Sequence, residues 1–237
     1  MKILALGDIH CRLDTTDLIH KLIGELGHNF DVMLLAGDLT DNGIIEEAEN
    51  LAHQLKPYVA AIPVIAILGN HDHELGKAEQ ITHAMRDVGV IMLEGTTCEV
   101  DDVGFVGTKG FCGGFDENLI QPFGENALKT FIRTSIDEAL RLENAISKLF
   151  TCQNKVVLMH YAPIKATLQG EPAELFPFLG TSWLADAVDR RGADVIFHGH
   201  AHHGSPYGRT RGNIPVHNVS RFVQLEASGK PYCVLTM

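Results

Sequence analysis

The ten residues at positions 63–72 read PVIAILGNHD and join a short apolar run to a polar ending. The run PVIAIL has the length of one buried strand, and it stops where Gly69 is followed by Asn70, His71 and Asp72. Asparagine has little structural reason to follow glycine at a strand end beside a histidine. This stretch therefore predicts a strand that delivers polar side chains to a site at its carboxyl end.

Two earlier apolar runs end in the same way: residues 3–6 (ILAL) stop at GDIH, and residues 32–36 (VMLLA) stop at GD. Helical spacing of apolar residues fills positions 17–26 and 44–55 between the runs. This alternation predicts parallel strands with right-handed crossovers, and sites in such sheets form at the carboxyl ends of strands. The side chains expected to face one crevice are Asp8, His10, Asp38, Asn70 and His71.

The second half of the chain reads as further strands interrupted by one long helical stretch at 125–149. The run 156–159 stops at His160, and the run 194–197 is followed by HGHAH at positions 198–202. We expect the remaining strands at 90–93, 99–106, 216–219, 221–225 and 232–235. We interpret residues 109–150 as a lid-like insertion within a single domain that spans residues 1–237.

Composition narrows the class of protein. The formal net charge of -11 disfavours binding to phosphate backbones, so nucleic acid is not an expected partner. Five cysteines, an odd number without a CxxC pair, favour a reducing compartment over a disulfide framework. The start of the chain has no signal-peptide pattern, and no apolar segment is long enough to cross a bilayer. We therefore expect a cytoplasmic protein that does not depend on a membrane.

The candidate ligands offer nitrogen and oxygen atoms and no thiolate sulfur. They are Asp8, His10, Asp38, Asn70, His160, His200 and His202. Such atoms suit manganese, iron or zinc. Seven ligands are too many for one tetrahedral ion but fit two ions that share a carboxylate. Two ions roughly 3.5–4 Å apart can clamp the attacking and leaving oxygens of a phosphoryl transfer, and a hydroxide between them is a nucleophile near neutral pH.

The order of these motifs resembles the calcineurin-like metallophosphoesterase superfamily. That pattern runs DxH, GDxxD, GNH followed by Asp or Glu, a lone His, and then GHxH. This chain carries it at Asp8 and His10, at 37–41, at 69–72, at His160 and at 199–202. The resemblance spans positions 8–202 and implies an α/β fold, a four-layer α/β/β/α sandwich of two mixed sheets.

The resemblance also implies a role for each residue. The first ion would be held by Asp8, His10, Asp38 and His202, and the second by Asp38, Asn70, His160 and His200. His71 would protonate the leaving oxygen while Asp41 orients its ring, which is sound chemistry for a histidine near pH 7. The implied reaction is hydrolysis of a phosphomonoester or phosphodiester by a metal-bridging hydroxide.

The chain departs from the family pattern after His10, where many relatives have glycine and this chain has Cys11 and Arg12. Arg12 could contact a substrate phosphate or simply lie on the rim of the site. We interpret Cys11 as inert packing, although a redox role or a soft contact to an ion stays open. His217 could approach the metal cage from a neighbouring strand. Arg209 and Arg211 are further candidates for phosphate contacts.

Several functions are compatible with these residues. The expected substrates are a phosphorylated small molecule, a cyclic nucleotide or a phosphoprotein. The main alternative is a non-catalytic metal-binding scaffold for protein interactions, but such scaffolds tend to lose the histidine of the GNH motif, and His71 and Asp41 are both present. A metal-dependent hydrolase of another ester or an amide is a third possibility, because two-metal sites also serve aminopeptidases.

Overall fold

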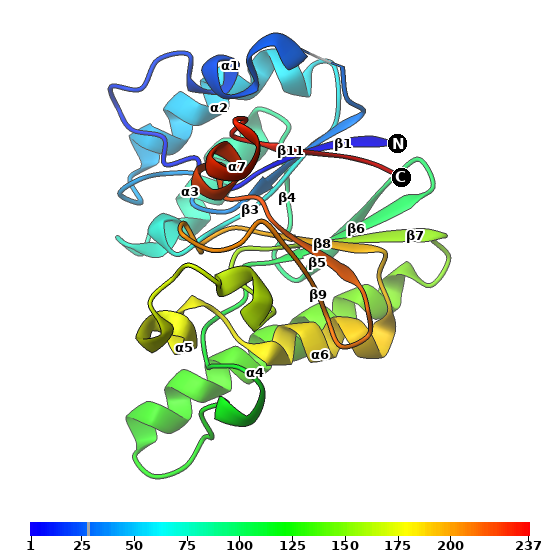
Figure 1. Ribbon diagram of the computed structural model, residues 1–237. Coiled ribbons are helices and arrows are strands. Elements are labelled where there is room, and N and C mark those ends of the chain that lie inside the picture. The colour runs from blue at the N-terminus through cyan, green and yellow to red at the C-terminus, as the bar shows by residue number, and fades with distance from the viewer. Residues whose placement is uncertain (28) are drawn as a thin grey trace.

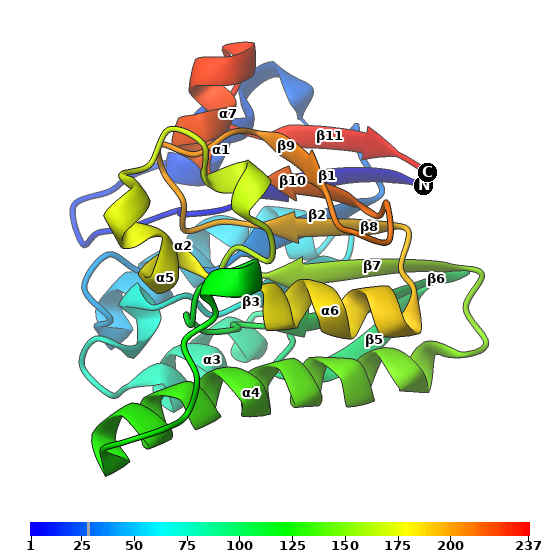
Figure 2. The ribbon, with the colours of Figure 1, turned by 60° about the horizontal axis from the view of Figure 1, so that its bottom comes forward.

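Two β-sheets stack face to face between outer layers of helices in the computed structural model, which describes residues 1–27 and 29–237 (Figures 1 and 2). Helices α1, α2 and α3 cover the first sheet, and α4 and α6 cover the second (Figure 1). Both sheets contain parallel and antiparallel pairs. The expected four-layer α/β/β/α sandwich of two mixed sheets is therefore confirmed.

The first sheet has the order β11-β1-β2-β3-β4, and only the β11–β1 pair is antiparallel. Its strands are β1 (Lys2–Leu6), β2 (Val32–Ala36), β3 (Val64–Ile67), β4 (Ile91–Met92) and β11 (Cys233–Thr236). The helices that follow its strands are α1 (Leu18–Ile23), α2 (Ile45–Val59) and α3 (Ala78–Asp87), with short 3₁₀ turns at Gly24–Leu26 and His71–His73.

The second sheet has the order β5-β6-β7-β8-β10-β9, with a parallel centre and antiparallel edges. Its strands are β5 (Thr96–Val100), β6 (Val103–Thr108), β7 (Asn154–Met159), β8 (Val195–His198), β9 (Tyr207–Arg209) and β10 (Pro215–Asn218). The helices of this half are α4 (Asn126–Ile146), α5 (Phe176–Leu179), α6 (Ser182–Arg191) and α7 (Arg221–Ser228). Short 3₁₀ turns lie at Asp116–Asn118, Ser147–Leu149, Lys165–Leu168 and Ala173–Leu175.

Every position of the central strands β2 and β3 is buried, because each sheet has the other sheet on one face and helices on the other. In the neighbouring β1, Ile3 and Ala5 pack between the two sheets, whereas Leu4 and Leu6 pack against the helices. Side chains alternate between the two faces of a strand, so both faces here demand apolar residues. This is why the strands appear in the sequence as unbroken apolar runs.

Helix α4 belongs to the outer layer of the second sheet. Its buried residues recur every three or four positions and pack against β6 and α6. The lid-like role expected for residues 109–150 stays a prediction, and α4 itself is part of the structural layer. No helix in the described ranges has the length and apolar character needed to cross a membrane.

The strand predicted at 221–225 is wrong, because these residues form the first turns of α7. Val223 and Gln224 are buried while Phe222 and Leu225 are exposed, which is the one-sided pattern of a surface helix rather than strand alternation. Gly229 ends the helix in a left-handed conformation, with φ of 72°. The connection between the two strands expected at 221–225 and 232–235 is therefore a helix end.

Candidate metal centre

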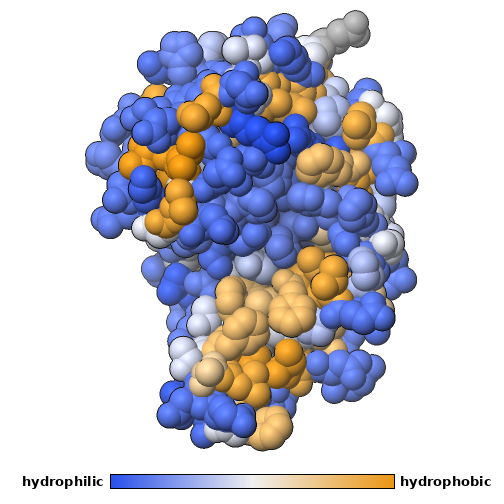
Figure 3. Space-filling model, turned by 90° about the vertical axis from the view of Figure 1, so that its left-hand side faces the viewer, coloured by the Kyte–Doolittle hydropathy of each residue, from blue (hydrophilic) through white to orange (hydrophobic). Residues whose placement is uncertain are grey.

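The carboxyl ends of β1, β2, β3, β7 and β8 meet at one edge of the sandwich, opposite the end where the two termini lie (Figure 1). Figure 3 faces this edge and shows a surface that is hydrophilic across its middle, with apolar areas above and below. The seven side chains singled out in the sequence come from the segments that follow these strands. The two halves of the chain therefore contribute to one site.

The first group of candidate ligands consists of Asp8, His10, Asp38 and His202. One potential ligand atom from each lies within 4.8 Å of the others. His202 Nε2 is 3.3 Å from Asp8 Oδ1, and His10 Nε2 is 3.7 Å from Asp38 Oδ2. These are the four residues that the resemblance implies for the first ion, and their ligation of a metal stays a prediction.

The second group consists of Asp38, His160 and His200, again with ligand atoms within 4.8 Å of one another. His160 Nε2 lies 3.3 Å from Asp38 Oδ1 and 2.9 Å from the side-chain oxygen of Asn70. Asn70 therefore reaches the same place as the second group. Asp38 is common to both groups, and a carboxylate in this position can bridge two ions.

The backbone at these ligands is strained. Within the described residues, eight non-glycine residues have positive φ, and four of them are the candidate ligands Asp8, His10, Asp38 and His200. A left-handed conformation costs an ordinary residue about 1–2 kcal/mol. Such strain persists only where the surrounding fold over-determines it, and it gathers at functional sites.

Glycine precedes the ligands because the backbone segments touch. A Cβ on Gly69 would overlap the backbone nitrogen of Asp38, which no side chain can tolerate. A Cβ on Gly37, where φ is 84°, would lie 2.5 Å from Nδ1 of His160. The glycines in the GD and GNH motifs therefore provide space for the residues that the motifs bring together.

The chemistry of His10 fits a cation. Both its ring nitrogens are buried, and neither makes a hydrogen bond within the described residues, although the carboxylates of Asp38 and Asp41 lie 3.7 and 3.2 Å away. Buried polar atoms without partners are rare and call for an unseen ligand. A metal ion beside Nε2 would satisfy that nitrogen and the Asp38 carboxylate, while Nδ1 faces the Asp41 carboxylate.

The charges of the second group also fit a cation. Burial lowers the pKa of His200 to about 3, so its imidazole is neutral and offers a lone pair. Burial also acts to lower the pKa of His160, but the charge of Asp38 and a hydrogen bond to it outweigh burial and raise that pKa to about 9. Asp38 is almost completely buried. A buried carboxylate is costly unless a positive charge lies beside it.

Asp72, to which the sequence reasoning assigned no role, holds two of the ligand loops together. Its carboxylate accepts hydrogen bonds from the backbone nitrogens of Gly69 (2.7 Å), Leu39 (3.1 Å) and Thr40 (2.8 Å), and from the Thr40 hydroxyl (2.7 Å). The side chain is fully buried, and burial raises its pKa to about 6. Asp72 thus fixes the loop after β2 to the loop after β3.

His71 and Asp41 are neighbours, but their contact differs from the expected one. Nδ1 of His71 lies 2.6 Å from the backbone carbonyl of Asp41, so the carbonyl and not the carboxylate orients the ring. The Asp41 carboxylate instead accepts a hydrogen bond from Arg12 Nε at 2.7 Å. The backbone nitrogen of His71 donates to Asp38 Oδ1 at 2.9 Å, which ties His71 to the shared carboxylate.

A pocket of about 470 Å³, here called the mouth pocket, opens beside the first group. The residues that line it include the site histidines His10, His71 and His202, together with Arg12, Arg221 and Phe222. Arg12 therefore shares a pocket with three histidines of the site. Arg221 and Phe222 were missed in the sequence because the residues were assigned to a strand, and no motif marks them.

The remaining candidates lie elsewhere. His217 packs between the rings of Phe197 and Tyr207, with centroid distances of 5.6 and 5.1 Å, and belongs to neither ligand group. Arg209 donates to the backbone of Asn213, and Arg211 pairs with Asp116 at 2.7 Å. The two arginines are thus engaged outside the mouth pocket.

Cys11 is fully buried, and burial raises the pKa of its thiol to about 12. A neutral buried thiol is a poor nucleophile and a poor metal ligand, which supports its interpretation as packing. All five cysteines of the chain are free.

One side of the second group is closed by α5, a contact that no sequence signal indicated. The carbonyl oxygen of Phe178 lies 3.4 Å from His200 Nε2, and the ring of Tyr161 lies 4.4 Å from the His200 ring. Helix α5 and Tyr161 therefore both lie against the ring of His200.

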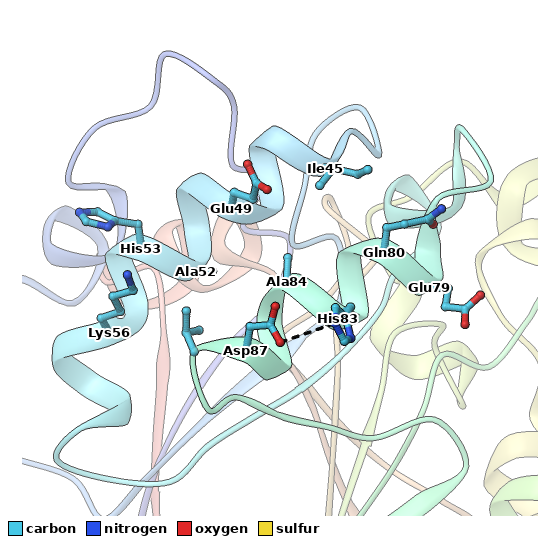
Figure 4. A pocket seen from close by; sticks show the side chains of 11 residues that line it. Ile45, Glu49, Ala52, His53, Lys56, Glu79, Gln80, His83, Ala84 and Asp87 are labelled. Carbon is cyan, nitrogen blue, oxygen red and sulfur yellow. Dashed lines mark ion pairs between the residues drawn. The ribbon is translucent and has the colours of Figure 1, made fainter.

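A larger pocket of about 660 Å³ lies between α2 and α3 on the outside of the molecule (Figure 4). The side chains that line it include Glu49, His53, Lys56 and the ion pair His83–Asp87, whose atoms are 3.7 Å apart. None of the seven candidate ligands lines this pocket. Converging polar groups, rather than volume, identify the catalytic candidate.

The chain belongs to the calcineurin-like phosphoesterase family, because the model of that family matches residues 1–204. The match runs from β1 to the segment after β8 and includes all seven candidate ligands. It confirms the resemblance inferred from the motifs. A search of curated proteins found no match.

Several solved structures are similar to the chain over most of its length. A phosphopantetheinyl hydrolase from Mycobacterium tuberculosis has a TM-score of 0.67 and 13% identity, over 99% of this chain and 95% of the other. Protein TT1561 of Thermus thermophilus has a TM-score of 0.58 and 13% identity, over 94% and 90%. A putative 5′-nucleotidase from Staphylococcus aureus has a TM-score of 0.55 and 16% identity, over 92% of this chain and 48% of that one. At these identities the likeness establishes the fold.

Proposed function

We propose that this protein hydrolyses a phosphomonoester or phosphodiester with two divalent ions, which would be manganese, iron or zinc. The observation that carries the proposal is the pair of ligand groups that share Asp38. Asp8, His10, Asp38 and His202 would hold one ion, and Asp38, Asn70, His160 and His200 the other. When bound, the ions would supply Lewis acidity and lower the pKa of a water molecule between them.

The chain's own residues would position the phosphoryl group and move the proton. We assign His71 as the general acid for the leaving oxygen, because it adjoins the ligand groups without belonging to the two that share Asp38. Its Nδ1 donates a hydrogen bond to the carbonyl of Asp41, so Nε2 is the nitrogen that would deliver a proton to the leaving oxygen. Asp41 acts as a positioning residue. Arg12, which lines the mouth pocket, would contact the phosphate.

The substrate we favour is a phosphorylated small molecule. The names of two structural neighbours, a phosphopantetheinyl hydrolase and a 5′-nucleotidase, support this choice. The mouth pocket also has the volume of a small-molecule site. A cyclic nucleotide and a phosphoprotein are the other substrate classes to be compared. The free cysteines support a cytoplasmic location for the reaction.

The test is turnover by purified protein loaded with Mn²⁺, Fe²⁺ or Zn²⁺. We expect release of p-nitrophenol from p-nitrophenyl phosphate, from bis(p-nitrophenyl) phosphate, or from both, and the preferred compound separates a monoesterase from a diesterase. Asp38→Asn is the control for contaminating enzymes, since it removes the shared charge and should abolish turnover. No turnover with any divalent ion would contradict the proposal and favour the non-catalytic alternative.

A further inference from the structure

The mouth pocket contains more positive charge than one phosphoryl group requires. Two arginines, Arg12 and Arg221, line it. Two divalent ions bring four positive charges, of which Asp8, Asp38 and a hydroxide between the ions would offset three. The remaining charge and the proton that His71 would deliver as the general acid then balance one phosphomonoester dianion. Asp41 pairs with Arg12, so the charge of Arg221 is the one left over. The surplus indicates a second anionic group in the ligand.

Arg221 is placed as a ligand-binding residue rather than as a structural one. Its Nε is buried and makes no hydrogen bond in the part of the chain that the structure describes. The charged groups that act on it are Asp8, Asp41 and Arg12, and the first of these would be neutralised by an ion. A buried donor without a partner costs about 1–3 kcal/mol. No hydrogen bond at Nε therefore anchors Arg221 to the described part of the fold, and the side chain lines the mouth pocket, where a ligand can engage it.

Arg12 has free donors on the same side. Its Nε is tied to Asp41 Oδ2 at 2.7 Å, which fixes the plane of the guanidinium. The side chain is 64% exposed, so its terminal nitrogens remain accessible in the mouth pocket. A fixed, planar guanidinium suits bidentate binding of a phosphoryl group.

Phe222 adds an apolar wall beside these charges. Its ring lies 4.6 Å from the His202 ring, and the Arg221 guanidinium carbon lies 4.7 Å from the ring centroid. This cation–π contact holds Arg221 toward the pocket. Phe222 is 40% exposed and lines the mouth pocket, so its ring can pack against the organic part of a ligand.

We propose, building on the function proposed above, that the mouth pocket binds a second phosphoryl group of the same substrate through Arg221 and Arg12. The favoured substrates are then organic diphosphates, and simple monophosphates are bound less well. Phe222 packs against the organic group. Arg221 and Phe222 are the residues that set this preference.

The test compares AMP and ADP, which differ by one phosphoryl group, as inhibitors of bis(p-nitrophenyl) phosphate turnover with free Mn²⁺ held equal. We expect ADP to bind at least about tenfold more tightly than AMP, as charge-assisted hydrogen bonds to two arginines imply. In Arg221→Ala this ratio should fall to about threefold or less, because Arg12 alone would remain on the second phosphoryl group. In the control Arg211→Ala, which removes an arginine paired with Asp116 on the surface, the ratio should not change.

The two proposals can fail separately. Equal binding of AMP and ADP by the wild-type protein overturns the second-phosphoryl proposal. This result needs no folded Arg221→Ala variant, and it leaves the proposed hydrolysis intact if turnover is strong. Unchanged discrimination in a folded Arg221→Ala variant overturns it as well. If no substrate is turned over, calorimetric binding of AMP and ADP to the Mn²⁺-loaded protein tests the same ratio without relying on catalysis.

Discussion

Four of the candidate ligands have a backbone conformation that is unfavourable for residues other than glycine. Asp8, His10, Asp38 and His200 all have positive φ. Each costs the fold about 1–2 kcal/mol, and this cost is accepted where turns must aim side chains inward from strand ends. The glycines beside them let the loops approach closely, because a Cβ at Gly37 or Gly69 would overlap atoms of a neighbouring segment.

Gly37→Ala should therefore be more destabilising than Gly76→Ala. Both glycines have positive φ, of 84° and 66°, but only Gly37 faces a clash, with the ring of His160. We expect Gly76→Ala to lower the free energy of unfolding by about 1 kcal/mol and Gly37→Ala by about 2 kcal/mol more. Urea unfolding measures both values. Equal losses would show that the contact with His160 does not matter.

His71→Ala should lower kcat by about 10²-fold or more while the protein keeps its metal content, because His71 is assigned to proton transfer and not to ligation. Steady-state kinetics and elemental analysis of the same sample provide the two readouts. His83→Ala, in the exposed pocket between α2 and α3, is the matched control. Undiminished activity, or loss of metal from His71→Ala, would contradict the assigned role.

At the scale of elements, the apolar runs predicted the central strands because all their faces are buried. The runs at 3–6, 32–36 and 156–159 correspond to β1, β2 and β7 within a residue or two. The apolar pattern predicted a strand instead of α7, because Phe222 and Leu225 are exposed and only one side of this helix is covered. A short surface helix with apolar residues on its outer side cannot be told from a strand by pattern alone.

The second sheet's helices are joined by an ionic contact whose contribution depends on pH. Glu143 of α4 accepts hydrogen bonds from Arg190 and Arg191 of α6, at 2.7–3.1 Å. The hydrogen bonds from Arg190 are the main reason that the pKa of Glu143 is lowered from its usual 4.5. The stabilisation is therefore present above pH 4.5 and is lost as the pH falls through the lowered pKa of the folded state.

Glu143→Gln should lower the free energy of unfolding by about 1 kcal/mol at pH 7, since a carboxylate shared by two arginines is held more strongly than a single exposed pair. The difference from wild type should shrink as the pH falls below 4.5, because both proteins then carry a neutral group there. Urea unfolding at pH 7 and at low pH measures this difference. A loss that does not vary with pH would mean that packing, and not charge, joins α4 to α6.

At the scale of the whole molecule, the site depends on the stacking of the two sheets. Nδ1 of His160, from the second sheet, lies 2.9 Å from the carbonyl of Ala36 in the first. The ligand types and their order could be predicted from the sequence, because they follow strands. The position of the mouth pocket could not, because Arg12 and Arg221 are brought together by the connection from β10 to β11, which no local pattern encodes.

Removal of metal should destabilise the entire domain, because ligands from both sheets would be cross-linked by the ions. We expect EDTA-treated protein to gain about 2.7 kcal/mol of stability when Mn²⁺ is added at roughly 100 times its dissociation constant. Thermal unfolding with and without Mn²⁺ measures the gain, and Asp38→Asn is the control. The same melting temperature in both states would argue against a site that bridges the sheets.

Two ions that share Asp38 are the centre of the proposed function. Anomalous diffraction from a crystal grown with Mn²⁺ tests this arrangement most directly. We predict two anomalous peaks roughly 3.5–4 Å apart, with Asp38 bonded to both. One of them should have Asp8, His10 and His202 as its further ligands, and the other Asn70, His160 and His200. A single peak, or two peaks that Asp38 does not bridge, would contradict the shared-carboxylate arrangement.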